Sequence, residues 1–234
     1  MPHQPQPRPA MKHDFPFRQS ILKVFFPTGR FEVGWLTLAL VVGSLAVTLL
    51  TNFGTDRMMT DVFSITRYRH VEGIHWGWHT GLPEICHGEI WRLFTPMFIH
   101  FSFLHFVYNA IWIFIFGTLI EKRQGIWVLA LLVLVTASLS GLVQYAVRGP
   151  AFGGISGVVC GLLGYIWTRD MLDPGARLHL ERDVLVVGIC SCLWGSIGIV
   201  GHQAQIIHAA GFAIGLVIGI ASGLLPKRSY PYSS

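Results

Sequence analysis

Apolar residues occur along this chain in long blocks, not in the alternating or helical-period stripes of a soluble domain. The blocks cover residues 33–53, 103–120, 126–147, 155–168, 184–200 and 206–225. Continuous apolar runs of this kind indicate helices that cross a bilayer, for which about 20 residues are needed. The pattern therefore predicts an all-α, multi-pass membrane protein with six transmembrane helices.

Lysine and arginine residues predict the orientation of these helices. Basic residues precede the first block and follow the second, fourth and sixth, and they are Arg8, Lys12, Arg18, Lys23, Arg30, Lys122, Arg123, Arg169, Arg177, Arg182, Lys227 and Arg228. Six spans place all of them on one face, and cytoplasmic loops are the ones that carry excess positive charge. Both termini are therefore expected in the cytoplasm, with a long outer loop at about residues 54–102.

Composition supports this picture, since 52% of the residues are hydrophobic and only 12% are charged. The net charge of +5 would favour a nucleic-acid partner in a soluble protein. Here the basic residues flank apolar blocks, where they meet lipid headgroups. The expected partner is therefore the lipid bilayer, and no nucleic-acid partner is expected. Residues 1–30 are proline-rich and basic and are expected to form a disordered cytosolic tail, with a second tail at 227–234.

Three polar clusters fall at one depth in this topology, just inside the outer face. Ser156 opens the fourth block, His208 opens the sixth, and His105 with Asn109 lies at the start of the second. Polar groups inside a membrane are costly and mark a function or a partner. The span from Ser156 to the end of the fourth block has only some 13 residues, so Ser156 is expected below the membrane surface, beside a cavity that admits water.

These residue types suit nucleophilic catalysis. A serine beside a histidine can act as a nucleophile with its general base. Gly211 and Gly215 share roughly one helix face with His208 and predict a close approach to the fourth span, which carries Gly157, Gly161 and Gly164. Alternatively, Ser156 is a small packing residue and His208 a structural histidine with satisfied hydrogen bonds.

The second cluster suits stabilisation of an oxyanion. His105 and Asn109 are four residues apart and face the same way on a helix. Both can donate a hydrogen bond without a fixed charge, although an interhelical hydrogen-bonded pair is an equally simple interpretation. The chain has no Asp or Glu between Gln124 and Arg169 or after Asp183, which favours a Ser-His dyad over a triad with an acid.

Four motifs in this order resemble those of the bacterial rhomboid intramembrane serine proteases. They are WR at Trp91 and Arg92, HFSFLHFVYN with His100, His105 and Asn109, GGISG with Gly154, Ser156 and Gly157, and HAAGFAIG with His208, Gly211 and Gly215. The resemblance covers about residues 33–225 and implies a six-helix rhomboid protease domain at 31–226. It also implies an inner-membrane location in a bacterium.

The resemblance implies a mechanism as well. Ser156 would attack the scissile carbonyl and His208 would act as base and then acid. The oxyanion hole would be formed by His105, Asn109 and the Ser156 backbone N–H. Substrates would be single-span membrane proteins cut near the outer face, and neither a cofactor nor a metal would be required.

One position departs from the family pattern. Relatives commonly carry a tyrosine one turn after the serine, stacked on the catalytic histidine, and this chain has Cys160 there. Cys160, Cys190 and Cys192 lie in apolar segments and show no CxxC spacing, so small apolar packing residues are the simpler interpretation of these three, and only Cys86 lies in a polar loop.

Three other functions compete with a protease. A catalytically inactive rhomboid-like protein would bind client helices without cutting them. A transporter or channel would need ionisable residues along a path, and the later spans contain no acidic residues. A haem or metal centre is suggested by the histidines but would leave Asn109 and Ser156 unexplained.

Overall fold

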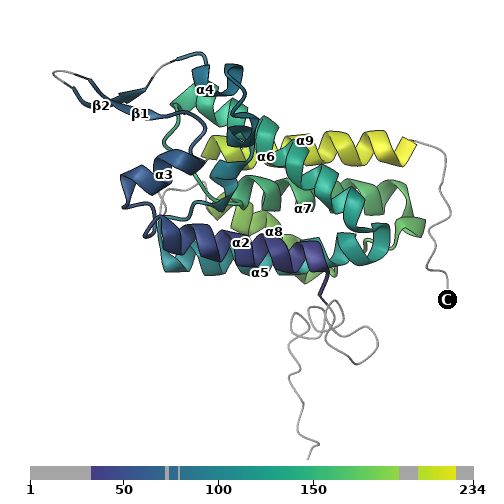
Figure 1. Cartoon of the computed structure of the whole chain (residues 1–234). Helices are drawn as coiled ribbons and strands as arrows, with labels where there is room; N and C mark the ends of the chain where they lie inside the picture. The colour runs from purple at the N-terminus through teal and green to yellow at the C-terminus, as the bar shows by residue number, and fades with distance from the viewer. Residues whose placement is uncertain (1–32, 72–73, 79, 195–204, 225–234) are drawn as a thin grey trace, which may run out of the picture.

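The computed structural model describes residues 33–71, 74–78, 80–194 and 205–224. Most of these residues are helical (Figure 1). Each apolar block of the sequence contains one helix. These are α2 (Trp35–Leu50), α5 (Phe103–Gln124), α6 (Ile126–Arg148), α7 (Ser156–Leu172), α8 (Arg182–Trp194) and α9 (Gln205–Leu224).

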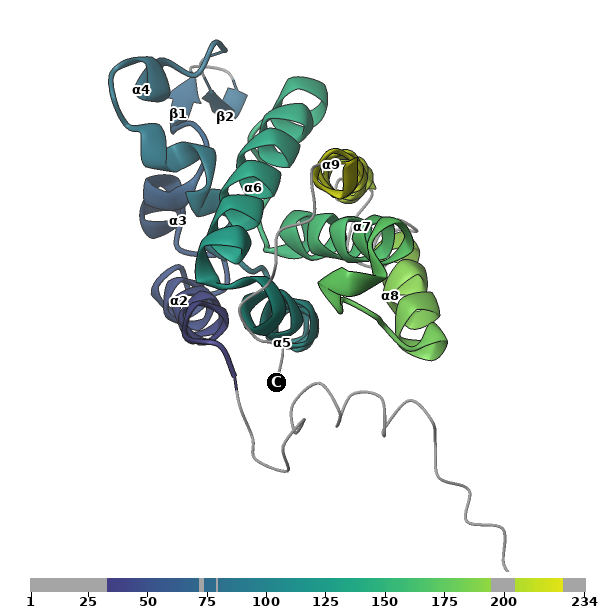
Figure 2. The ribbon, with the colours of Figure 1, turned by 90° about the vertical axis from the view of Figure 1, so that its right-hand side faces the viewer.

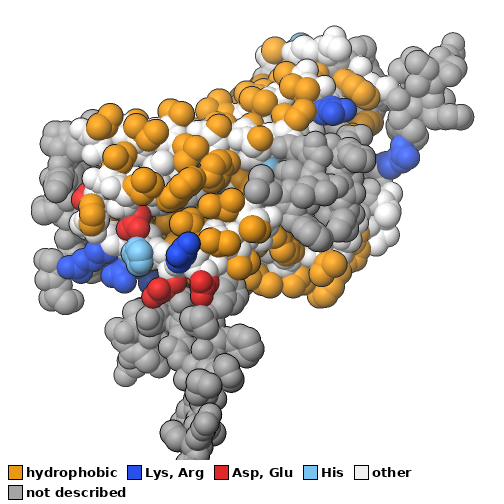
Figure 3. Space-filling model, turned by 180° about the vertical axis from the view of Figure 1, so that it is seen from behind, with side chains coloured by type: hydrophobic (Ala, Val, Ile, Leu, Met, Phe, Trp, Pro, Cys, Tyr) orange, Lys and Arg blue, Asp and Glu red, His pale blue; other side chains and the backbone are white. Residues whose placement is uncertain are grey.

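Three of the described helices are long and apolar enough to cross a membrane, namely α5, α6 and residues Ile206–Leu224 of α9, and α2 is a shorter apolar helix. Hydrophobic side chains cover much of the face seen in Figure 3, and charged side chains gather toward its edge. A membrane protein with a mostly helical fold is therefore confirmed. The two expected tails at 1–30 and 227–234 and the end of the fifth block lie outside the described residues.

The fourth helix is longer than the sequence predicts. α7 has 17 residues, or about 25 Å, and continues past residue 168, where the prediction ended it. The reason is an ion pair between its last turn and the residue that follows it, in which Arg169 Nη2 lies 2.9 Å from Asp173 Oδ2 with both side chains buried. Because the charges meet inside the protein, Arg169 does not have to end the helix.

α7 lies in the interior of the bundle and contacts α5, α6, α8 and α9 (Figure 2). It is buried on nearly every face, as expected for a helix that is apolar all round. Its side chains Leu162, Leu163 and Ile166 pack with Ile113 and Phe116 of α5 in the hydrophobic core.

Glycines bring α7 and α9 into backbone contact. A Cβ atom on Gly211 would overlap the carbonyl oxygen of Gly157, and one on Gly215 would overlap that of Gly161. Only glycine permits this approach, which is a common packing mode of membrane helices. The contact determines the distance between the first turns of the two helices.

The segment between α2 and α5 forms a small folded cap at one end of the bundle (Figure 1). It contains α3 (Arg57–Phe63), an antiparallel hairpin of β1 (Tyr68–Val71) and β2 (Ile74–Trp78), α4 (Pro83–Cys86), and the short 3-10 helices η1 (Ile90–Leu93) and η2 (Thr95–Phe98).

Arg92 holds this cap together. Its buried guanidinium donates hydrogen bonds to the carbonyl oxygens of Asp61 and Ser64, at 2.6 and 2.7 Å, and pairs with Glu89 at 2.7 Å. The two carbonyls lie at the end of α3, where helix carbonyls lack partners of their own. The WR motif thus stabilises the cap, and its Trp91 is partly exposed.

Candidate active site

Ser156 and His208 meet between the first turns of α7 and α9. Their Oγ and Nε2 atoms are 2.8 Å apart, although 52 residues separate them in the sequence. His208 is 7% exposed. This distance allows the serine hydroxyl to donate to a neutral imidazole, which is the arrangement of a nucleophile and its general base.

The turn before Ser156 requires glycine. Gly154 has a φ of 106°, and its N–H donates to the carbonyl of Pro96 at 3.1 Å. A Cβ atom there would also lie only 2.8 Å from the ring of His105. A side chain at this position would therefore distort the turn and displace a candidate oxyanion donor.

His105 and Asn109 lie on one face of α5, against this turn. The same Cβ position is 3.7 Å from Asn109 Nδ2. Asn109 is 2% exposed, and neither its Nδ2 nor His105 Nδ1 has a hydrogen-bond partner within the described residues. Buried polar nitrogens without partners are uncommon, and these two belong to side chains that lie against the turn before Ser156.

A buried histidine supports this arrangement from behind. The ring of His100 contacts that of His105 edge-on, with centroids 5.0 Å apart. His100 Nδ1 lies 3.2 Å from Thr48 Oγ1 on α2 and 3.1 Å from the carbonyl of Phe98. His100 thus links the start of α5 to α2. The other histidine near the candidate site in sequence, His202, lies outside the described residues.

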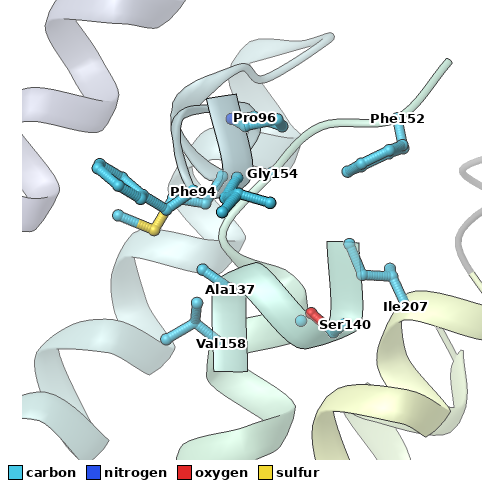
Figure 4. Close-up of a pocket in the computed structure, with 11 residues that line it drawn as sticks. Phe94, Pro96, Ala137, Ser140, Phe152, Gly154, Val158 and Ile207 are labelled. Atoms are coloured by element: carbon cyan, nitrogen blue, oxygen red, sulfur yellow. The ribbon is translucent and has the colours of Figure 1, made fainter. Parts of the chain in front are cut away.

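A small cavity adjoins the turn at Gly154 (Figure 4). Its lining includes Phe94, Ser140, Phe152 and Ile207. Ser140 Oγ is buried and has no hydrogen-bond partner in the described part of the chain. Ser140 is the one polar side chain among the residues that line this cavity, next to the candidate site.

Comparison with known proteins identifies the family. The family model of the Rhomboid domain matches residues 87–224. The chain belongs to the rhomboid family. It is 33% identical over 206 residues to the Rhomboid protease GlpG of Enterobacter sp. (strain 638), covering 87% of this chain and 69% of that relative. It is 32% identical over 205 residues to Rhomboid protease GlpG of Klebsiella pneumoniae, with the same coverage.

The family resemblance inferred from the motifs is therefore confirmed. The chain is a serine-type rhomboid protease, which is a membrane-embedded hydrolase. Of the motif residues, the rhomboid fold brings Gly154, Ser156, Gly157, His208 and Gly211 together with His105 and Asn109. Trp91 and Arg92 lie apart from them in η1 of the cap, and Gly215 lies one turn further along α9.

Sequence reasoning missed one residue that positions α9. Gln144 of α6 is buried, and its Oε1 accepts a hydrogen bond from the backbone N–H of Ile207 at 3.1 Å. That N–H is in the first turn of α9, which has no intrahelical acceptor for it. Gln144 thereby fixes the residue next to His208. The feature of the sequence that could have identified Gln144 is a polar glutamine inside an apolar span.

Sequence reasoning also missed a thiol pair in this rhomboid. Cys160 and Cys192 were treated as separate packing residues, and their Sγ atoms are 2.6 Å apart. No group of three or more His, Cys, Asp or Glu side chains suited to a metal ion occurs among the described residues.

Proposed function

We propose that this rhomboid protease cleaves single-span membrane proteins near the outer membrane face with a Ser156–His208 dyad. The observation that carries the proposal is the 2.8 Å contact between Ser156 Oγ and His208 Nε2. We further propose that the six apolar helices all span the bacterial inner membrane and that both termini are cytoplasmic. The distribution of basic residues supports this orientation.

The proposed reaction begins with proton transfer. As Ser156 Oγ attacks the scissile carbonyl carbon, His208 Nε2 takes the hydroxyl proton. The same imidazole then protonates the leaving amine, so that the amide bond breaks and an acyl-enzyme remains. Water, deprotonated by His208, hydrolyses the ester and restores the serine.

The oxyanion is proposed to bind three donors. The backbone N–H of Ser156 is at the start of α7, where it has no intrahelical acceptor and the helix dipole is positive. The side chains of His105 and Asn109 add two donors from α5. Their unpartnered nitrogens support this role, because such donors gain their hydrogen bonds only as the negative charge develops.

Replacing Asn109 with alanine is expected to lower kcat about 10²-fold with little change in KM, because the lost hydrogen bond forms mainly in the transition state. Cleavage of a single-span reporter in detergent measures both constants. Thr118→Ala is the matched control, since Thr118 is also a buried polar residue of α5 but is more than two turns further along. An equal loss in both variants would mean that Asn109 only supports the fold.

A fluorescent fluorophosphonate tests the dyad directly on detergent-purified protein. Wild type should be labelled, whereas Ser156→Ala and His208→Ala should not. Ser222→Ala, which alters another hydroxyl at the far end of α9, should be labelled like wild type. Absence of wild-type labelling, together with failure to cut a single-span reporter, would instead favour the inactive client-binding protein.

A further inference from the structure

Two cysteines from different helices meet beside the candidate active site. Cys160 is on α7, one turn after Ser156, and Cys192 is near the end of α8. Their sulfur atoms are in direct contact, 2.6 Å apart, and neither cysteine is part of a disulfide. Contact between the two sulfur atoms is the first geometric condition for a disulfide.

The pair also adjoins the candidate base. The main chain of Cys192 lies next to the imidazole of His208, whose Nδ1 has no well-aligned hydrogen-bond partner among the described residues. Movement of the α8 backbone at Cys192 would therefore displace the imidazole of His208. The other two cysteines, Cys86 and Cys190, are exposed, and no contact between them is found in the described residues.

The two thiols differ in access to solutes. Cys160 is 1% exposed, whereas Cys192 is partly exposed. A small oxidant would therefore reach Cys192 first, and the buried Cys160 would be in position to react with the product.

We propose that Cys160 and Cys192 form an oxidation-sensitive thiol pair, which a peroxide converts to a disulfide that slows proteolysis. The Cys192 sulfur attacks one peroxide oxygen, the O–O bond breaks, and a sulfenic acid and one water form when the peroxide is hydrogen peroxide. The Cys160 sulfur then displaces the sulfenic hydroxyl, which leaves as a second water with the thiol proton. Two reducing thiols reverse the change and become a disulfide themselves.

The effect on activity rests on the proposed function. A disulfide would tie α8 to α7 within one turn of Ser156 and constrain the backbone beside His208. Small displacements of reacting groups cost large factors in rate. We therefore expect the oxidised protein to cleave about tenfold more slowly than the reduced protein.

The experiment uses the full chain in detergent, treated with hydrogen peroxide, alkylated and digested. Mass spectrometry should find a Cys160–Cys192 cross-linked peptide. In wild type the cleavage rate of the oxidised protein should be about one tenth of that of the reduced protein, and dithiothreitol should restore the rate. In Cys160→Ser and Cys192→Ser the ratio of these two rates should stay near one, whereas Cys86→Ser and Cys190→Ser should behave like wild type.

Two results would overturn the proposal: no cross-linked peptide in wild type, or a cross-linked peptide with an unchanged cleavage rate. Failure of the proposed function has a different signature, because the reduced protein would then cleave nothing. The mass measurement does not depend on activity and still decides whether the pair forms.

Discussion

Ser156→Ala and His208→Ala are each expected to lower kcat/KM for a single-span reporter by about 10³-fold or more, and the double variant by no more than either single change. The two side chains act as one unit across the 2.8 Å contact. Without the base the hydroxyl is a poor nucleophile, and without the hydroxyl the imidazole has no proton to take. Their effects are therefore not additive.

The measurement is the initial cleavage rate of all four proteins in one detergent, with folding checked by thermal unfolding. His179→Ala is a suitable control, since His179 is an exposed histidine that pairs with Asp170 at the other end of α7. It should cleave like wild type. Multiplicative losses in the double variant would mean that Ser156 and His208 act independently, which contradicts a dyad.

Gly215→Ala is expected to destabilise the fold by about 1–3 kcal/mol and to lower proteolysis strongly. Alanine favours a helix over glycine by about 1 kcal/mol, so intrinsic propensity alone predicts the opposite sign. The new Cβ would overlap the backbone carbonyl of Gly161, and that backbone cannot yield without separating α7 from α9. Separation would lengthen the distance between Ser156 and His208.

Gly43→Ala in α2 provides the matched control. The nearest atom to its new Cβ is 3.5 Å away, in the ring of Phe98, which is ordinary van der Waals contact. This variant should unfold at the same temperature as wild type or higher and retain its activity. Thermal unfolding in detergent, followed by circular dichroism, measures the stability of both variants, and cleavage of a single-span reporter measures their activity. If Gly215→Ala were as stable as Gly43→Ala, the backbone contact of α7 with α9 would not limit stability.

Much of the local organisation followed from the sequence, because its causes are local. An apolar run must satisfy its own backbone hydrogen bonds in a bilayer, and a helix does so within one segment. The six apolar blocks therefore indicated where helices form. The predicted end of α7 was wrong. The helix continues because Arg169 pairs with Asp173, and this pair depends on both side chains being buried together.

The candidate site was only partly predictable for a different reason. The spacing of His208, Gly211 and Gly215 predicts a face that can approach another helix, and the motifs identify the family. Neither says that Gln144 reaches the N–H of Ile207 or that Cys160 faces Cys192. Those contacts depend on the rotation and separation of helices that are distant in the chain.

The sequence by itself determined the class of protein, the approximate positions of the helices in the six apolar blocks and the rhomboid family, because these depend on apolar run length and on motifs within single segments. Only the tertiary structure decided that Ser156 Oγ and His208 Nε2 lie 2.8 Å apart and that the two thiols meet. The physical reason is the packing of α7 against α9 and α8, where each distance is determined by the size of side chains on two helices at once.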